Sequence, residues 1–484
     1  MNPASARFDP VVAWTILAYV AVMTAIGVVA WRRTADLSDF ILGGRRLGRW
    51  VTALSAEASD MSGWLLLGLP GLAYASGLES VWLAGGLLAG TWLNWRFMAA
   101  RLRTATVNAG DALTLPDYFE RRFADPHRVL RVVSASLILF FFTFYTSSGL
   151  TAGARLFETV FGVDYHIAVA LGAGAILAYT FLGGFLAVSW TDLVQGLLML
   201  FALLAVPVVL LEALGGWQTA QARIAAINPA LVDPFTDATG EPLGLIAILS
   251  LLGWGLGYFG QPHILARFMA IRDPAEIGPA RRIAVTWVAL SLGGALLVGL
   301  LAIPHLQPAL EGPDTEKVFI HLVGALFHPL LAGILLSAVL AAVMSTADSQ
   351  LLVASSALTE DLYRPFLRPR ASQVELVWVG RTAVAVIALL ASILAWNPQN
   401  RVLDLVAYAW GGFGAAFGPS LLLSLYWRRM TRQGALAGLL VGGATVIVWS
   451  RLQGGWFDLY ELVPGFVLSA LAVVLVSLLS AQKR

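Results

Sequence analysis

The 484-residue chain is strongly apolar, since 58% of its residues are hydrophobic, only 12% are charged, and the mean hydropathy is +0.77. A soluble domain carries roughly 25% charged residues, so the composition excludes an ordinary soluble protein. The absence of cysteine excludes disulfides, thiolate metal sites and a thiol nucleophile. The net charge of +2 does not indicate a nucleic-acid partner, and none is expected.

Thirteen apolar runs approach the roughly 20 residues that a helix needs to cross a bilayer. They predict one all-α membrane domain over residues 1–484. The expected helices are 11–31, 51–76, 80–100, 130–155, 164–186, 190–212, 243–268, 283–304, 324–352, 376–396, 402–426, 435–451 and 462–480. The run 11–31 has neither the basic start nor the cleavage site of a signal peptide, so we expect it to remain as a membrane span.

Basic residues fall into alternate loops between these runs. The basic loops contain Arg32, Arg33, Arg45, Arg46 and Arg49; Arg101, Arg103, Arg121, Arg122 and Arg128; Arg267, Arg272, Arg281 and Arg282; Arg364, Arg368 and Arg370; Arg428, Arg429 and Arg432; and Lys483 and Arg484. The positive-inside rule makes these loops cytoplasmic, which predicts an N-terminus outside and a C-terminus inside. We expect a multi-pass protein of a cell membrane, of the bacterial inner-membrane type.

Polar residues interrupt the second run at its middle. Asp60, Ser62 and Gly63 lie inside the membrane-length segment 51–76. A charged side chain near the centre of a bilayer costs about 2.5–3.5 kcal/mol on insertion scales, so it usually faces a pathway or an ion. The small residues around Asp60 predict local unwinding, which frees backbone carbonyls to bind a cation.

The run 243–268 contains a second break. Glycine and proline weaken or end a helix, and this run holds several of them close together. They are Gly253, Gly255, Gly257, Gly260 and Pro262. The two breaks lie five helices apart, which is typical of inverted-repeat transporters. We therefore predict repeats over 51–212 and 243–426, with peripheral helices at 11–31 and within 435–480.

A third polar cluster lies in the run 324–352. It contains Ser345, Thr346, Asp348 and Ser349. Hydroxyl and carboxylate oxygens are hard ligands that suit alkali cations. Serine and threonine in membrane helices often bond only to their own backbone or a neighbouring helix. The acidic Asp348 and the matching break at Asp60 favour an ion site instead.

These motifs together resemble the sodium/solute symporter family, and within it the sodium/proline symporters. The similar stretches are 40–71, 112–123, 148–158, 253–270 and 345–363, which lie in order along most of the chain. The resemblance implies a leucine-transporter-type fold, with ten core helices in two inverted five-helix repeats and with helices 2 and 7 broken.

The resemblance also implies a sodium site between helices 2 and 9. Its ligands would be the backbone carbonyls of Ala58, Met61 and Ala342 and the side chains of Ser345 and Thr346. Asp60 matches the carboxylate that the family needs for sodium-dependent transport. Sodium is therefore the expected coupling ion, and no organic cofactor is expected.

A proline pocket would adjoin the sodium site. The resemblance assigns it to Ser62, Gly63, Trp64, Tyr145, Trp254, Tyr258 and Pro262. A half-helix N-terminus suits the carboxylate of a zwitterion, and aromatic residues suit the pyrrolidine ring. Because 11% of the chain is aromatic, ordinary packing explains each of these aromatic residues as well as a pocket role does.

Two features depart from the family pattern or extend it. Glu57 stands where we expect a small residue such as glycine. Asp192 matches an acidic residue that some relatives use in a second sodium site, so we hypothesise a second cation site from Asp192, Asp348 and Ser349. The alternative is that these groups bond to each other or to water, or that one carboxyl is protonated.

The predicted function is sodium-coupled import of L-proline by alternating access, carried out by a monomer in the lipid bilayer. Three alternatives stay open. One is a symporter of the same family for pantothenate, a monocarboxylate or a sugar, and another is a transport-inactive membrane sensor. The third, a membrane enzyme, is not expected, because the sequence has no nucleophile-elbow motif, phosphate loop or HExxH motif.

Overall fold

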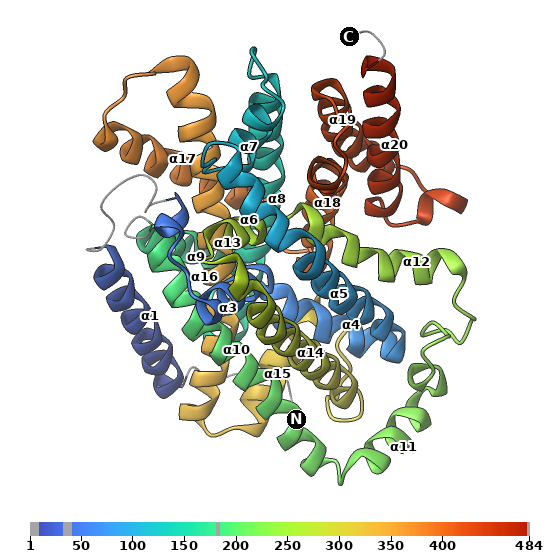
Figure 1. Cartoon of the computed structure of the whole chain (residues 1–484). Helices are drawn as coiled ribbons and strands as arrows, with labels where there is room; N and C mark the ends of the chain where they lie inside the picture. Colours follow the sequence, from blue (N-terminus) through green and yellow to red (C-terminus); the bar gives the residue numbers. More distant parts are fainter. Residues whose placement is uncertain (1–8, 32–40, 181–183, 482–484) are drawn as a thin grey trace.

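The computed structural model describes residues 9–31, 41–180 and 184–481. Within these ranges the protein is helical, and its only β-type pairs are two isolated bridges, Leu47–Ile271 and Thr236–Pro242. Figure 1 shows α1 (Pro10–Trp31) at one edge of the bundle and α19 (Arg432–Trp449) and α20 (Leu462–Ala481) at the opposite edge. Four of the basic residues that predict the orientation lie outside the described residues, namely Arg32, Arg33, Lys483 and Arg484.

The first half of the chain follows the predicted order of apolar runs. Its elements are α3 (Arg49–Asp60), η2 (Trp64–Gly68), α4 (Leu69–Ser76), α5 (Val81–Leu93), η4 (Asn94–Met98), α6 (Ala99–Asn108), α7 (Leu115–Arg122), α8 (Val129–Phe161), α9 (Tyr165–Thr180) and α10 (Phe185–Ala213). Here η2 and η4 are short π-helical turns within longer helical runs.

The second half begins with the short helix α11 and continues with further long apolar helices. Its elements are α11 (Trp217–Ile227), α12 (Leu245–Gly253), η6 (Trp254–Gly260), α13 (Pro262–Ala270), α14 (Ile277–Ala302), α15 (Val318–Leu326), α16 (Pro329–Ser356), η9 (Ala357–Leu367), α17 (Gln373–Leu394) and α18 (Val402–Tyr426).

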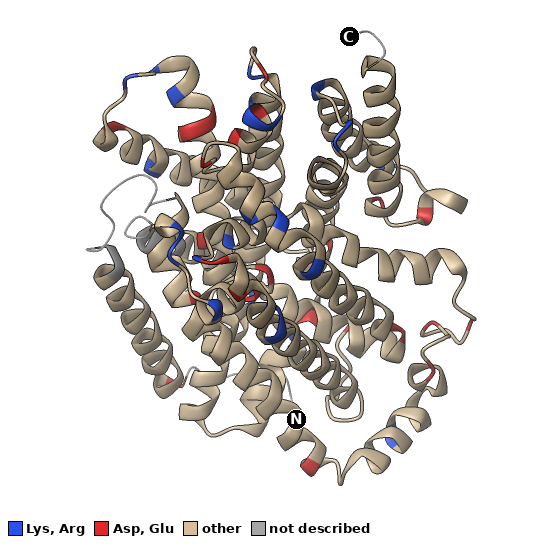
Figure 2. Cartoon of the chain, in the orientation of Figure 1, with Lys and Arg blue, Asp and Glu red and all other residues tan. Residues whose placement is uncertain are grey.

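Ten helices in the described residues are long and apolar enough to cross a membrane, or eleven if the bent pair 245–260 and 262–270 counts as one span. The predicted number of thirteen stays a prediction. Residues 64–108 form one continuous helical run that includes parts of two predicted spans, and the apolar helix at 165–175 is short. Figure 2 shows the long helices mostly tan, with few charged segments along them.

The structure confirms both predicted breaks. α3 ends at Asp60, where the amide of Ser62 donates to the Asp60 carbonyl at 2.9 Å and closes a tight turn. The other break bends the chain by 45° between residues 245–260 and 262–270. Gln261 there is extended, and Pro262 cannot donate the next helical hydrogen bond. Each break therefore arises from the local sequence that predicted it.

Burial separates the central helices from the peripheral ones. The most apolar window of the run that contains α16 is 83% buried, compared with 22% for α1 and 28% for α20. α3 packs against α10, α13, α14 and α16. The first break is therefore enclosed by protein, whereas the edge helices present most of their surface outward. Unwound backbone at membrane depth is tolerated only in such an enclosed position.

Candidate functional site

The predicted sodium ligands of α3 and α16 meet in the structure. The Ser345 hydroxyl donates to the Ala58 carbonyl at 2.8 Å and contacts the Ala342 carbonyl at 3.2 Å. The Thr346 hydroxyl is buried and has no hydrogen-bond partner, and Met61 is also fully buried beside the end of α3. Carbonyl and hydroxyl oxygens are the hard, neutral ligands that suit a monovalent cation. The residues present therefore fit sodium.

Asp60 lies at the end of α3 next to this oxygen cluster. Its side chain is fully buried, and neither carboxylate oxygen has a hydrogen-bond partner. Its backbone carbonyl accepts from the Tyr145 hydroxyl at 3.1 Å and from the Trp64 indole at 3.2 Å. The backbone of the break is thus held by two predicted pocket residues, while the carboxylate is left available to a cation.

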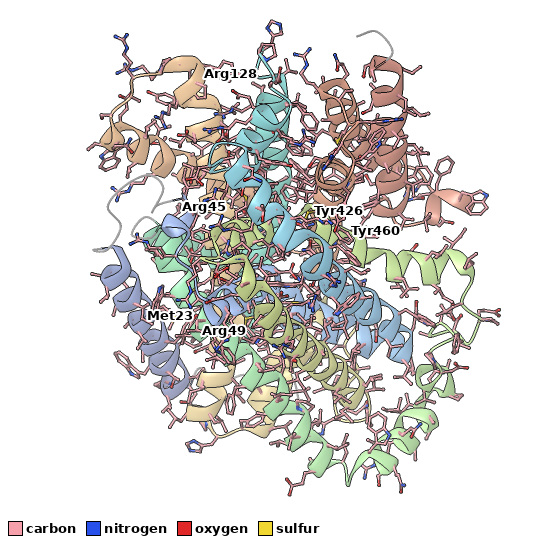
Figure 3. All side chains as sticks on the ribbon, in the orientation of Figure 1. Met23, Arg45, Arg49, Arg128, Tyr426 and Tyr460 are labelled. Carbon is pink, nitrogen blue, oxygen red and sulfur yellow. The ribbon has the colours of Figure 1, made fainter. Side chains whose placement is uncertain are left out.

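Two of the predicted aromatic residues, Trp254 and Tyr258, lie at the second break and pack against α18. Trp410 of α18 donates its indole N–H to the Trp254 carbonyl at 2.7 Å. Its ring lies edge-to-face with Tyr258, with a centroid distance of 4.9 Å. Trp254 stacks on Tyr460, which Figure 3 labels, at 5.3 Å. Such pairs hold the rings in fixed orientations, which is what an apolar wall for a small solute requires.

The remaining predicted pocket residues lie at the two breaks. Ser62 and Gly63 form the turn between α3 and η2, and Pro262 begins α13. All three are buried. The Ser62 hydroxyl lies 3.5 Å from the Trp64 amide, as a weak cap on η2. The pocket residues therefore come from both broken segments and from the middle of α8.

Sequence reasoning gave no site role to three residues that hold this cluster together: Gln261, Trp410 and Tyr460. Gln261 donates to the carbonyls of Gly257 and Trp410, both at 3.1 Å, and so joins η6 to α18. Trp410 had a signal, because it is a membrane-depth tryptophan followed by Gly411 and Gly412. Tyr460 had none, since it lies in the connection before α20 and reaches the site only through tertiary packing.

Gly257 makes the contact with Trp410 possible. A Cβ atom at this position would overlap the Trp410 indole. We expect Gly257→Ala to displace the indole and to raise the solute concentration for half-maximal binding by about tenfold or more, because overpacking costs roughly 1–3 kcal/mol. Gly293→Ala is the matched control, since Gly293 of α14 has open space at its Cβ position. Equal binding by the two variants, measured by equilibrium dialysis, would contradict this role.

The structure corrects the prediction for Arg267. The positive-inside pattern assigns it to a cytoplasmic loop, but it is a fully buried residue of α13. Its guanidinium donates to Asp192 at 3.1 Å, to Ser349 at 2.5 Å and to Ser55 at 3.1 Å. The positive-inside count missed this because arginine is tolerated at membrane depth when a carboxylate pairs with it.

Arg267 lies within the hypothesised second cation site. It contacts Asp192 and Ser349 directly and interacts electrostatically with Asp348. The structure therefore brings all three predicted residues near one protein-borne positive charge. A second sodium ion at this place stays a prediction, and the guanidinium would have to share these ligands with it.

Two cavities are lined by residues of the elements around the site. One of about 420 Å³ is lined by residues around the start of α18, among them Asp404 and Tyr408, and by Phe144. The other, of only about 30 Å³, is lined by Leu42, Pro262 and neighbouring residues. Phe144 directly precedes Tyr145, and Tyr408 lies two residues before Trp410. Phe144 and Tyr408 pack edge-to-face at the larger cavity, with a centroid distance of 4.9 Å.

The side with the small cavity is held together by contacts between the segment before α3 and the end of α13. The Leu47 amide donates to Ala270 at 3.2 Å, and the Arg272 amide donates to Leu47 at 3.0 Å. Arg45, labelled in Figure 3, donates to the Met269 carbonyl at 2.7 Å and pairs with Asp111 at 2.9 Å. These bonds must break before a path can open between the two segments.

Two broken helices around a buried, oxygen-lined cluster define a multi-pass secondary transporter. Solved structures agree on the fold. A Na+-coupled sialic acid symporter, in a substrate-bound outward-open state, matches with a TM-score of 0.80 at 20% identity, over 98% of both chains. MhsT in complex with L-phenylalanine matches with a TM-score of 0.54 at 16% identity, over 90% of this chain and 98% of that one. The fold is therefore of the leucine-transporter type.

The sequence comparisons are more specific. The model of the sodium:solute symporter family matches residues 40–442, and the chain belongs to this family. A sodium/proline symporter from Salmonella typhimurium is 56% identical over 470 residues, covering 96% of this chain and 92% of that protein. The high-affinity proline transporter PutP of Bacillus subtilis is 50% identical over 459 residues, covering 95% of this chain and 96% of that protein.

Proposed function

We propose that the protein is a sodium-coupled symporter that imports L-proline by alternating access. The observation that carries this proposal is the contact of Ser345 with Ala58, beside the unpartnered carboxylate of Asp60. It places neutral oxygen ligands and a buried negative charge together at a helix break, as a bound cation requires. The proteins named as sodium/proline symporters, at up to 56% identity, support the same ion and solute.

The solute pocket lies beside the ion. Trp254, Tyr258 and Tyr145 provide aromatic surface for a pyrrolidine ring. The turn at Ser62 and Gly63 precedes η2, so the positive end of that helix suits the carboxylate of proline. A symporter of the same family with another small solute is the alternative that competition with unlabelled solutes tests.

Sodium acts on the cycle by joining α3 to α16. An ion held by Ala58 and Met61 on one side and by Ala342, Ser345 and Thr346 on the other stabilises the state in which these helices touch. Coupling is reciprocal, so sodium must favour proline binding by the same factor as proline favours sodium binding. The membrane potential adds about 2.3 kcal/mol per charge for each 100 mV, which drives accumulation of proline.

The orientation in the membrane is part of the proposal. The N-terminus is placed outside and the C-terminus inside, in a bacterial inner membrane, and the monomer is the functional unit. The two repeats are 51–212 and 243–426. Arg45 and Arg272 lie together where the segment before α3 meets the end of α13, and this group of basic residues supports a cytoplasmic side there. The basic segments are the ones that stay in the cytoplasm.

The first test is uptake of labelled L-proline into proteoliposomes, with and without an inward sodium gradient. We expect the gradient to drive accumulation and Asp60→Ala to abolish it, because the buried charge that balances sodium is lost. Glu241→Ala, at an exposed acidic residue, is the control and should transport normally. Proline uptake that does not depend on sodium would refute the coupling. Sodium uptake without proline uptake would indicate that the protein transports a different solute of the family.

A further inference from the structure

His263 is a buried polar side chain that neither the proposed sodium site nor the proposed solute pocket uses. It is the second residue of α13, directly after Pro262, and it is fully buried. In the part of the chain that the structure describes, neither of its ring nitrogens has a hydrogen-bond partner. Buried polar atoms are rarely left unpaired in native structures, so the imidazole points to a partner that the protein itself does not supply.

The imidazole lies beside Tyr145, one of the proposed pocket residues. Its ring packs edge-to-face on Tyr145, with a centroid distance of 5.8 Å, and on Phe142 at 5.7 Å. The Tyr145 hydroxyl in turn donates to the carbonyl of Asp60 at the first break. Since Pro262 marks the second break, His263 belongs to one broken segment and packs on the residue that holds the other.

The position of His263 along α13 brings its ring to the level of the breaks. Arg267 lies four residues later on the same face of the helix and donates to Ser55 of α3 and Ser349 of α16. α13 starts at the second break, whereas α3 ends at the first, at Asp60. His263 therefore lies one turn nearer to both breaks than Arg267 does.

The ring offers an acceptor to a cationic donor. Without a carboxylate partner, an imidazole at neutral pH is mostly uncharged and has one donor nitrogen and one acceptor nitrogen. Among the described residues, no carboxylate pairs with His263. The polar hydrogens of Tyr145 and Trp64 are directed to the Asp60 carbonyl, so these two pocket residues act as donors. The ammonium of a zwitterion needs an acceptor instead, and the imidazole provides one.

We propose that His263 is a specificity-determining residue of the solute pocket, and that its acceptor nitrogen binds the secondary ammonium of L-proline. The inference rests on the proposed function and deepens it, because it assigns the recognition of one group of the solute. The positive end of η2 takes the carboxylate and the aromatic residues take the ring, so His263 serves the third group. A site built to bind an N–H group rejects an analogue without it, because its own buried polar atom is then left unpaired.

Displacement of labelled L-proline from the purified full-length protein, in saturating sodium, tests this inference. Two unlabelled solutes are compared: L-proline and its ether analogue (S)-tetrahydrofuran-2-carboxylate, in which a ring oxygen replaces the amine. We expect His263→Phe, which keeps a planar ring but removes both nitrogens, to weaken L-proline binding by about 10- to 100-fold, because a hydrogen bond to a charged group is lost. Binding of the ether should change little, so the preference for L-proline falls by a similar factor.

Further variants make the result specific. His263→Asn and His263→Gln each place an amide oxygen near the position of one ring nitrogen, and one of them should recover part of the preference for L-proline. His263→Leu also removes both nitrogens, and it replaces His263→Phe if the phenylalanine variant does not fold. His166→Phe is the matched control, because the His166 side chain is 39% exposed and contacts Asp164, and it should keep the wild-type preference. Size-exclusion chromatography shows whether each variant is folded.

The remaining outcomes separate this inference from the proposed function. An unchanged preference for L-proline in His263→Phe and His263→Leu would overturn the inference. An equal loss of binding for both solutes would also overturn it, since that result indicates a packing role alone. Either result leaves the proposed function intact, because the wild type still binds L-proline. A wild type that binds no L-proline would overturn the proposed function together with the inference.

Discussion

Arg267→Met is expected to lower the free energy of unfolding by about 3–5 kcal/mol, because it leaves the Asp192 carboxylate buried without its partner. The guanidinium joins α13 to Ser55 of α3, Asp192 of α10 and Ser349 of α16. Its loss therefore loosens several central helices at once. Unfolding of the purified protein in a denaturing-detergent titration, followed by helical circular dichroism, measures the change.

Two comparisons make this prediction specific. The double variant with Arg267→Met and Asp192→Leu should recover much of the lost stability, since replacing both partners of a buried pair by apolar residues is often neutral. Arg272→Met is the surface control, because Arg272 pairs with Glu276 but is 62% exposed, and such pairs contribute only about 0–1 kcal/mol. A similar loss for Arg267→Met and Arg272→Met would show that the buried pair has no special role.

Ser345→Ala is expected to raise the sodium concentration for half-maximal proline uptake by about 10- to 100-fold. A hydroxyl bonded to a charged group contributes about 1.5–3 kcal/mol, and each 1.4 kcal/mol is a factor of ten. The Ala58 carbonyl also loses its contact with α16, so the two helices are no longer joined at this point. Uptake measured over a range of sodium concentrations at fixed proline gives the shift.

The matched control lies on the same helix. Ser355 is also a buried serine of α16, but its hydroxyl only bonds back to Leu352 at 3.0 Å. Ser355→Ala should therefore leave the sodium dependence unchanged. If both variants shift the sodium concentration equally, the effect comes from the helix as a whole, and Ser345 is not a ligand.

The local signals in the sequence predicted the parts of the site that lie within one segment. Asp60 beside small residues predicted the first break, and the glycines before Pro262 predicted the second. Helix breaking is a property of the residues at the break, so it can be read without knowledge of the neighbours. The oxygen-rich cluster around Ser345 was found for the same reason, since hydroxyl groups are rare in an otherwise apolar run.

The local sequence signals did not predict contacts between distant segments. Arg267 looks like a loop arginine in the sequence, and only the proximity of Asp192, 75 positions away, turns it into a buried ion pair. The stacking of Tyr460 on Trp254 likewise depends on how α20 packs against α18 and η6. Side-chain environment is set by packing between distant segments, and a one-dimensional pattern does not contain it.

The sequence by itself determined that the chain is an all-helical membrane protein with two broken helices and oxygen ligands beside one of them. Apolarity, helix breaking and ligand type are properties of single residues and short runs. Only the tertiary structure decided which buried charges are balanced. It paired Asp192 with Arg267 and left Glu57 and Asp60 together without a basic partner in the described ranges. Charge balance depends on distance in space, and folding alone sets that distance.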